Sequence, residues 1–385
     1  MIHLVSGNTT GYTIPMHTRN YSSIILQAML LTSLMSIPMV DVCSETRSDT
    51  GVSTKTMTTA DEGPLRTVPF ITLRNKTGSD NAAQYYGGER SPLTAGYCEL
   101  SRKPINSIKT IAEIAPFYIP DEIVNMDAVR ETTIDGFWQR MEHGSNGHAP
   151  VLYTHGFNID FEKGCKRALI LKESLGLKGR FALFSWPSDG SLTNYTHDEA
   201  DLYWSVLPLR EILAGMIDHF GSGHTNLVAH SLGTRGVMLA LVLLAQSQQD
   251  SRPLFNQLVL IAPDIDVTIF KQYLPIIRPL VRHITVYVSA NDSPLALSRQ
   301  LHGYPRLGEA GEHLEGLTGI DIIDLSDIPR RAPSGHIYHL HQSLVTEDLD
   351  QLINDNKTAA QRSKLKQVGE NQWRMQPSAA DTQPR

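Results

Sequence analysis

Cysteine is scarce in this 385-residue chain, which holds only Cys43, Cys98 and Cys165. Such an odd and sparse set does not make the disulfide framework of a small secreted domain, and the sequence leaves open whether Cys98 pairs with Cys165. The signatures CxxC, HExxH and Walker A are missing as well. Metal and nucleotide chemistry therefore lack support, and we expect neither a metal nor another cofactor.

An excess of positive charge is also absent. The chain has 34 Lys and Arg against 40 Asp and Glu, a formal net charge of −6, and no concentrated basic stripe. Nucleic acid is therefore not an expected partner. With 41% hydrophobic and 19% charged residues, the chain can bury a core of one large domain with extensions, or of two domains.

A long apolar run is missing too. The longest candidate, residues 24–37 (IILQAMLLTSLMSI), is too short and too polar for a transmembrane helix, which needs about 20 apolar residues. It matches the apolar region of a signal peptide, with residues 42–44 as a cleavage site and Met16 as an alternative start. We therefore expect export to the periplasm or cell envelope. A disordered leader on a cytoplasmic protein is the alternative.

The motif Ala229-His230-Ser231-Leu232-Gly233 lies between a short apolar strand and an apolar helical stretch, residues 234–246. A small residue, x, Ser, x, Gly at such a junction is typical of the nucleophile elbow of α/β hydrolases. Ala229 replaces the usual Gly, but one extra methyl should still let the turn close. The turn would expose the Ser231 hydroxyl and leave the Leu232 N–H free for developing negative charge. An ordinary helix N-cap is the alternative role for Ser231.

A second loop follows an apolar strand within residues 149–158 (APVLYTHGFN). In an α/β hydrolase this loop supplies the second N–H of the oxyanion hole, which we assign to Phe157. Gly156 allows the backbone to bend around the reacting carbonyl. His155 lies far upstream of the serine, so we expect it to support the loop rather than act as a base. We expect His155, Gly156 and Gly233 to support the site without taking part in the reaction.

Strands alternate with helices along the chain, which predicts an α/β-hydrolase fold: a mostly parallel sheet with helices on both faces and extra N-terminal strands. Four segments are expected: a leader and Ser/Thr-rich linker (1–60), N-terminal strands and a helix (61–146), the hydrolase core (147–356) and a disordered polar tail (357–385). Pro208 should kink or restart its helix. The predicted strands are 68–73, 95–100, 107–114, 179–186, 226–229, 258–262, 283–289 and 320–325. Residues 87–90 are predicted as a loop, and the predicted helices include 126–141, 161–175, 198–220 and 269–281.

Two carboxylates compete for the acid of a Ser-Asp-His triad. Asp292 follows the second strand after the elbow, the usual place for the acid, in a polar turn that can aim its side chain at the site. Asp264 follows the first strand, where some lipases place the acid, but it could also cap the following helix. Asp266 competes for that capping role. We therefore assign Asp292.

His336 follows the last predicted strand and is assigned as the base that later acts as the acid. The other candidate histidines are His302, His313, His339 and His341. A metal site at residues 336, 339 and 341 is not favoured, because no paired acidic or cysteine ligand motif accompanies them.

Several sequence words together resemble a bacterial family of uncharacterised α/β hydrolases, known by the domain-of-unknown-function label 900. The resemblance covers about residues 67–353, and FSWPS and HGYPRLG are its most specific words. It implies a hydrolase fold and a Ser-Asp-His site formed by Ser231, Asp292 and His336, but no substrate. Members usually carry Asn after the elbow glycine, where this chain has Thr234. The matching words are VPFITLRN, GGER, GYCEL, THGFN, FSWPSDGSLTNY, DEA, AHSLGTR, APDID, VYVSANDSPLALS, LHGYPRLG and SGH.

These features predict a serine hydrolase that cleaves carboxylic esters, in the manner of an esterase or lipase, through an acyl-enzyme. A thioesterase, amidase or peptidase with the same triad is one alternative, and a cell-envelope binding or scaffold protein with little turnover is another. The expected substrate is a small-molecule or lipid ester, compatible with association at a membrane surface. Oligomeric state is not predicted.

Overall fold

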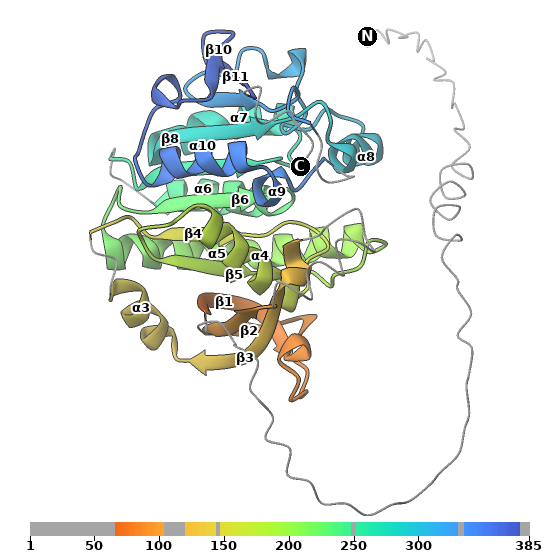
Figure 1. Ribbon diagram of the computed structural model, residues 1–385, viewed down its shortest axis with the longest axis vertical. Coiled ribbons are helices and arrows are strands. Elements are labelled where there is room, and N and C mark those ends of the chain that lie inside the picture. The colour runs from red at the N-terminus through yellow and green to blue at the C-terminus, as the bar shows by residue number, and fades with distance from the viewer. Residues whose placement is uncertain (1–65, 104–119, 144–146, 248–251, 330–334, 378–385) are drawn as a thin grey trace, which may run out of the picture. The chain divides into compact units, whose positions relative to one another are not determined.

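A computed structural model describes residues 66–103, 120–143, 147–247, 252–329 and 335–377. The leader, the predicted strand 107–114 and the last eight residues of the tail lie outside these ranges. Within them, the strands form an 11-stranded sheet in the order β10-β11-β9-β8-β7-β6-β4-β5-β1-β2-β3. Figure 1 shows β1–β3 and β10–β11 at opposite ends of this sheet.

The centre of the sheet is parallel, as the alternation of strands and helices predicts. Neighbouring pairs run in register, for example Leu152 opposite Leu227 and Val228 opposite Val259. Most residues of these strands are buried, and β4 to β7 are buried throughout, as expected for a parallel sheet covered on both sides. They are β4 (Val151–Thr154), β5 (Phe181–Ser185), β6 (Asn226–His230), β7 (Phe255–Ile261), β8 (Val281–Val288) and β9 (Asp321–Asp324).

Helices cover both faces through two separate apolar clusters. One cluster packs α3, α5, α6 and α7 on one face of the strands, and the other packs α4 and α10 on the opposite face. Figure 1 shows α10 on the viewer's side of the sheet. The helices are α3 (Ile134–Glu142), α4 (Phe161–Ser174), α5 (Tyr195–Phe220), α6 (Gly233–Ser247), α7 (Val267–Ile277), α8 (Ser293–His302), α9 (Tyr338–His341) and α10 (Ser343–Ile353), with 3-10 turns η1 (Ala82–Gln84), η2 (Pro120–Ile123), η3 (Arg278–Leu280), η4 (Glu312–Leu314) and η5 (Ala359–Gln361).

The N-terminal strands form an antiparallel meander of β1 (Arg66–Lys76), β2 (Tyr86–Arg102) and β3 (Val124–Thr132), and β1 pairs parallel with β5. The helix predicted over 126–141 is therefore wrong in its first half. Pairing with β2 makes that half a strand, and Thr133 then caps α3 by accepting the N–H of Gly136 at 3.0 Å. The loop predicted over 87–90 also lies within β2.

Two further predictions differ from the structure. Of the two effects predicted for Pro208, a kink or a restart of the helix, the restart does not occur, because α5 continues from Tyr195 to Phe220. Buried residues on both sides of the proline, such as Val206 and Leu209, pack into the same apolar cluster and hold the helix together. The tail predicted to be disordered forms a hairpin over residues 365–375.

This hairpin consists of β10 (Leu365–Gln367) and β11 (Gln372–Met375), and β11 pairs parallel with β9. Its sequence is polar, but Trp373 and Met375 alternate into the core. Arg362 supplies a further anchor, because its buried Nη1 lies 2.7 Å from Asp348 Oδ2 and 3.1 Å from the Tyr287 hydroxyl. Because residues 365–375 are mostly polar, the sequence did not predict that they extend the sheet.

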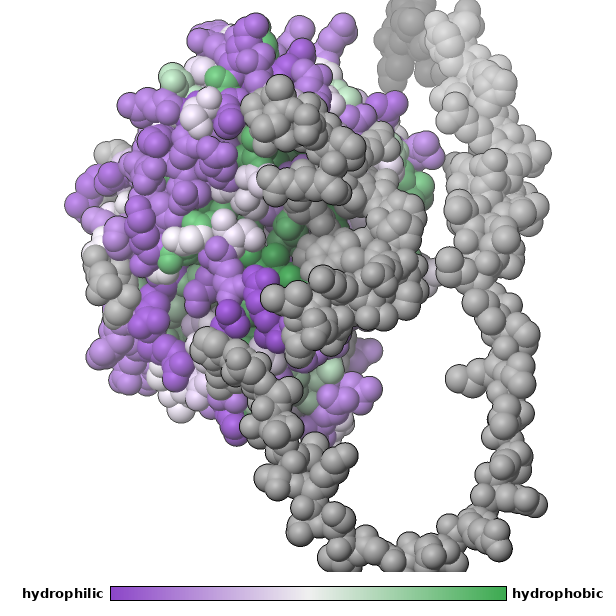
Figure 2. Space-filling model, viewed as in Figure 1, coloured by the Kyte–Doolittle hydropathy of each residue, from purple (hydrophilic) through white to green (hydrophobic). Residues whose placement is uncertain are grey.

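Cys98 and Cys165 form a disulfide that joins β2 to α4, with the two Cα atoms 6.4 Å apart. It ties the N-terminal meander to the helix that follows β4. The outer surface is mostly hydrophilic on the face drawn in Figure 2, where apolar residues show between the polar ones near the middle of the view. No helix in the described ranges combines the length and apolar character required to cross a membrane.

Candidate active site

Ser231 occupies the sharp turn between β6 and α6. Its φ of 52° lies in the left-handed region, which a non-glycine residue seldom adopts unless its surroundings hold it there. Its N–H donates to the Ile261 carbonyl at 2.9 Å, and its carbonyl accepts the N–H of Thr234 at 3.1 Å and the Thr234 hydroxyl at 2.5 Å. The strained turn is thus held from both sides, as a nucleophile elbow requires.

The loop after β4 packs directly against this turn. A Cβ added to Gly156 would lie 2.8 Å from Ser231 Cβ, and one added to Gly233 would lie 2.1 Å from the His155 carbonyl oxygen. Only glycine allows so close an approach at these two positions. The peptide units of Phe157 and Leu232 follow immediately, so the two assigned oxyanion donors belong to loops in mutual contact.

Asp292 and His336 meet at the carboxyl ends of β8 and β9. His336 Nδ1 lies 2.7 Å from Asp292 Oδ2, and the other carboxylate oxygen caps α8 by accepting the Leu295 N–H at 3.0 Å. The Asp292 side chain is fully buried. Its two oxygens therefore have two different tasks, which fixes the orientation of the carboxylate and hence of the imidazole.

His336 reaches the elbow through His230, the residue before Ser231. The two imidazole rings lie 4.7 Å apart, and His230 Nε2 lies 3.3 Å from the His336 carbonyl oxygen. The buried ring of His339 packs on the other side of His230 at 4.4 Å. Burial, together with His339 and His336, lowers the pKa of His230 well below its usual value, so His230 is neutral at pH 7.

Asp264, the alternative acid, has other partners. Its N–H donates to the Ser231 carbonyl at 3.2 Å. Oδ1 of its carboxylate accepts Arg306 Nε at 2.7 Å and the Ser298 hydroxyl at 2.6 Å, while Oδ2 accepts the Tyr195 hydroxyl at 2.5 Å. Both oxygens of the Asp264 carboxylate thus accept hydrogen bonds from residues other than a histidine.

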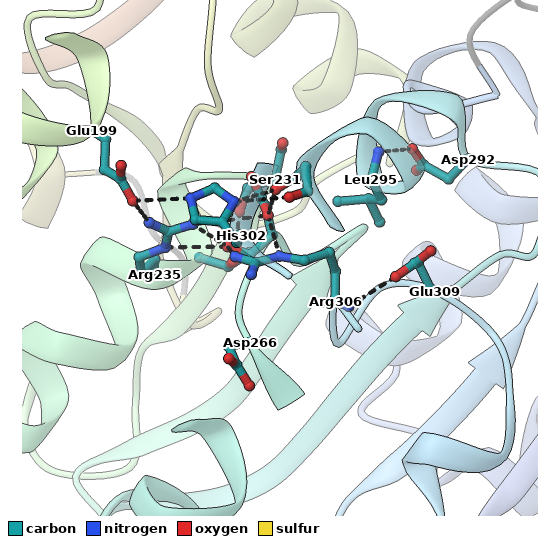
Figure 3. Close-up of polar contacts among 12 residues, drawn as sticks. Glu199, Ser231, Arg235, Asp266, Asp292, Leu295, His302, Arg306 and Glu309 are labelled. Carbon is teal, nitrogen blue, oxygen red and sulfur yellow. Dashed lines mark hydrogen bonds and ion pairs between the residues drawn. The ribbon is translucent and has the colours of Figure 1, made fainter. Parts of the chain in front are cut away.

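Arg235 completes this buried network from α6. Its Nη2 lies 3.8 Å from Asp264 Oδ1, and its Nε and Nη2 donate to the Asp264 carbonyl at 3.2 and 3.0 Å. Figure 3 shows Arg235 and Arg306 approaching the same point next to Ser231, with Glu199 at the outer end of Arg235. Burial acts to raise the pKa of the Asp264 carboxyl, but the Arg306 and Arg235 guanidinium groups outweigh burial and lower it.

The suggestion that Asp264 caps the following helix is wrong. Asp266 caps α7 by accepting the N–H groups of Thr268 at 2.7 Å and Ile269 at 3.4 Å. Figure 3 shows the Asp266 side chain apart from the network around Ser231. Asp264 is instead the shared anion of two buried arginines.

His155 is buried beneath its own loop. Its ring stacks on Trp186 with centroids 5.1 Å apart, and Trp186 Nε1 donates to its carbonyl oxygen at 2.9 Å. Burial and then the neighbouring Arg74 lower the pKa of His155 to about 3. His155 therefore stays neutral and supports the loop.

The other histidines have different surroundings. His302 Nδ1 lies 2.9 Å from the Ser298 carbonyl oxygen, and its Nε2 lies 3.5 Å from Glu199. His313 lies in η4, and the side chain of His341 is outside the described set. His336 is thus the histidine that the structure pairs with the assigned acid.

One group in the described part of the chain brings possible metal ligands together: Asp189, His197 and Asp198, whose ligand atoms lie within 4.8 Å of one another. Both oxygens of Asp198 already accept hydrogen bonds, from the Ser188 hydroxyl at 2.5 Å and from the N–H groups of Asp189 and Asn158 at 3.0 and 3.2 Å. A cation there would share the Asp198 carboxylate with these donors.

Sequence reasoning missed several residues that shape the site. Arg74 gave one available signal, because it is a charge at the end of an otherwise apolar strand. Asp264 gave another through its position after a strand at the carboxyl edge of the sheet. The residues that contact Arg74 and Asp264 come from distant segments, and the sequence gave no signal for those contacts. The missed residues are Arg74, Trp186, Tyr195, Arg235 and Arg306.

Comparison with known proteins adds a family and a fold. The family model described as "Alpha/beta hydrolase of unknown function (DUF900)" matches residues 136–356. No curated protein matches the chain.

Among solved structures, the chain is similar to a predicted CIB-like hydrolase from Thermoplasma acidophilum, with 9% identity over 68% of this chain and 92% of that one and a TM-score of 0.32. It is also similar to lipase B from Aspergillus fumigatus, with 13% identity over 58% of each chain and a TM-score of 0.36. Carboxylesterase CesB from Bacillus subtilis shares 10% identity over 55% of this chain and 85% of that one, with a TM-score of 0.31. At these identities the likeness concerns the fold alone.

Proposed function

Because the chain belongs to the DUF900 family of alpha/beta hydrolases, we propose that it is a serine hydrolase in which Ser231, His336 and Asp292 form a catalytic triad that cleaves carboxylic esters. One observation carries the proposal. The His336–Asp292 pair, 2.7 Å apart, lies against the ring of His230, the residue that directly precedes a serine in the left-handed conformation. This combination supports a nucleophile elbow over an ordinary helix cap at Ser231.

In the proposed reaction, Ser231 Oγ attacks the ester carbonyl carbon while His336 Nε2 takes the hydroxyl proton. The imidazolium that forms is stabilised by Asp292, which accepts the Nδ1 proton in a hydrogen bond. The carbonyl oxygen becomes an oxyanion, which accepts hydrogen bonds from the Phe157 and Leu232 N–H groups. Collapse expels the alcohol with the proton from His336 and leaves an acyl-enzyme.

Deacylation repeats these steps with water. His336 takes a proton from the water, the hydroxide attacks the acyl carbon, and Ser231 leaves with that proton as the acid is released. Esters are favoured over amides in this proposal because an alkoxide is a better leaving group than an amide anion and therefore depends less on protonation by His336. We therefore propose a small-molecule or lipid ester as substrate.

The test is labelling of the full chain with a fluorophosphonate, followed by hydrolysis assays on matched nitrophenyl esters, thioesters and amides. Labelling should occur at Ser231, and Ser231→Ala should keep the fold but lose on the order of 10⁴ to 10⁶ of the ester turnover. Retention of most of the activity by the alanine variant would refute the triad. Faster turnover of thioesters or amides would change the substrate class, and a folded but unlabelled protein would indicate a binding or scaffold protein.

We also propose that the protein is exported to the periplasm or cell envelope. The Cys98–Cys165 disulfide supports this, since such bonds form and persist mainly in oxidising compartments. The apolar run at residues 24–37 supports it independently as a signal-peptide core.

A further inference from the structure

Arg74 lies near the end of β1, in the N-terminal meander that precedes the residues matched by the family. Its side chain is buried, with 1% of the residue exposed. Register places Thr72 opposite Ser185 in β5, so Arg74 extends past the carboxyl end of β5. A buried arginine at this edge of the sheet requires an explanation, because it must find partners for its charge and its donors.

The guanidinium of Arg74 donates to uncharged acceptors in three separate parts of the chain. This one planar group therefore joins the loop after β4, the end of β5 with the loop that follows it, and the start of β2. The acceptors are the Ile159 carbonyl at 2.6 Å, the Ser188 carbonyl at 2.5 Å, the Ser185 hydroxyl at 2.9 Å, the Gly87 carbonyl at 3.2 Å and His155 Nε2 at 3.4 Å.

Contact with Arg74 selects the tautomer of His155. Arginine can only donate, so the neutral imidazole accepts at Nε2 and carries its proton on Nδ1. That proton then points at the Gly156 carbonyl, 2.9 Å away. Arg74 thus holds both ends of the 155–159 loop, at Ile159 directly and at Gly156 through His155.

Charge explains why an arginine suits this position. Burial lowers the pKa of Arg74 to about 10, and nearby carboxylates, with Asp160 and Asp198 the strongest, act in the opposite direction. Arg74 is therefore a cation at pH 7. Asp198 in turn accepts the N–H of Asn158, whose φ of 59° marks the bend of the same loop.

We propose that Arg74 is a positioning residue that fixes the 155–159 loop so that the Phe157 N–H points to the site of the oxyanion. This inference rests on the proposed function, because it takes Phe157 as an oxyanion donor. It assigns to the N-terminal meander a part in the reaction that goes beyond completing the sheet.

The test compares Arg74→Lys and Arg74→Met with Arg362→Met. Arg362 is a matched control, because it too is a buried arginine, paired with Asp348 and Tyr287 beneath α10. Active sites are titrated with a fluorophosphonate, so that kcat refers to folded sites only. Exchange of the amide hydrogens of residues 157–159 is measured on the same preparations by mass spectrometry.

Loss of one oxyanion donor lowers kcat by about 10²- to 10³-fold, so Arg74→Met should lose about 10²-fold in kcat per titrated site while KM changes by less than about threefold. Arg74→Lys keeps the charge without the planar fork and should lose about tenfold. The amides of residues 157–159 should exchange at least about tenfold faster in both variants. Arg362→Met should lower the melting temperature but change neither kcat nor this exchange.

Wild-type kcat per titrated site in both Arg74 variants, or exchange of the loop no faster than in Arg362→Met, would overturn the inference. Failure of the proposed function looks different. The wild-type protein would then take no label, and exchange of residues 157–159 alone would decide whether Arg74 fixes the loop.

Discussion

Replacing Asp292 with asparagine should abolish turnover while leaving the fold almost as stable as before. An asparagine oxygen can still accept the Leu295 N–H, and asparagine caps helices about as well as aspartate. Its amide would then face His336 Nδ1 across 2.7 Å, where only an acceptor suits the working tautomer. The same change in a chymotrypsin-type triad lowers kcat by about 10⁴-fold, and we expect a loss of that order here.

Asp264→Asn is the matched comparison, because it removes the same charge from the other carboxylate beside the elbow. Asp264→Asn should lower stability while leaving most of the turnover. Two buried guanidinium groups, of Arg306 and Arg235, would lose a shared anion, although Arg235 keeps Glu199. Breaking a buried ion pair in this way costs about 3–5 kcal/mol. For a domain of this size, that loss lowers the melting temperature by on the order of 5–10 °C.

Both variants are assayed for ester turnover per fluorophosphonate-titrated site and for thermal unfolding. Asp292→Asn should lose kcat and shift the melting temperature by no more than about 2 °C, since the helix cap survives. Asp264→Asn should unfold at lower temperature but keep turnover at its intact sites to within about tenfold, because the His336 pair is untouched. If Asp264→Asn is inactive and stable while Asp292→Asn is active, the acid of the triad has been assigned to the wrong strand.

Three further predictions concern pH, packing and export. The pKa values of His155 and His230 are lowered in the folded state, so below about pH 6.5 the unfolded chain binds protons that the folded chain does not, and stability falls. Urea unfolding should therefore give a free energy of unfolding about 2–3 kcal/mol lower at pH 5.5 than at pH 7.5. Equal values at the two pH values would contradict this. Gly233→Ala places a Cβ 2.1 Å from the His155 carbonyl oxygen and should cost at least about 1–3 kcal/mol in thermal unfolding and most of the labelling. Protein recovered from its host should begin after about Ser44, and an intact Met1 or Met16 terminus on soluble cytoplasmic protein would refute export.

The elbow and the parallel sheet could be predicted because local sequence determines them. A small residue on each side of Ser231 and apolar runs broken by polar turns give signals within a few residues. The position of Asp292 after the second strand beyond the elbow follows from chain order. The catalytic roles of these residues remain predictions until turnover is measured.

Features that depend on distant pairing escaped prediction. Residues 126–132 have apolar side chains at spacings compatible with a helix, but β2 provides an edge with which they pair as a strand. The strand at 372–375 is polar apart from two side chains, and β9 decides its conformation. The Asp264 network joins α5, α6, α8 and the loop after α8, so no single stretch of sequence reveals it.

The extent of the sheet has a practical consequence for anyone who wishes to express the protein as a shorter fragment. The family match, residues 136–356, suggests obvious cutting points at both ends. A cut at 136 would remove β1 and expose one side of β5, and a cut at 356 would remove β11 and expose one side of β9, the strand that leads toward His336. Each new edge would present unpaired N–H and C=O groups, which favour aggregation. A fragment spanning residues 66–377 keeps β5 paired with β1 and β9 paired with β11, and is the shorter chain we would expect to remain soluble.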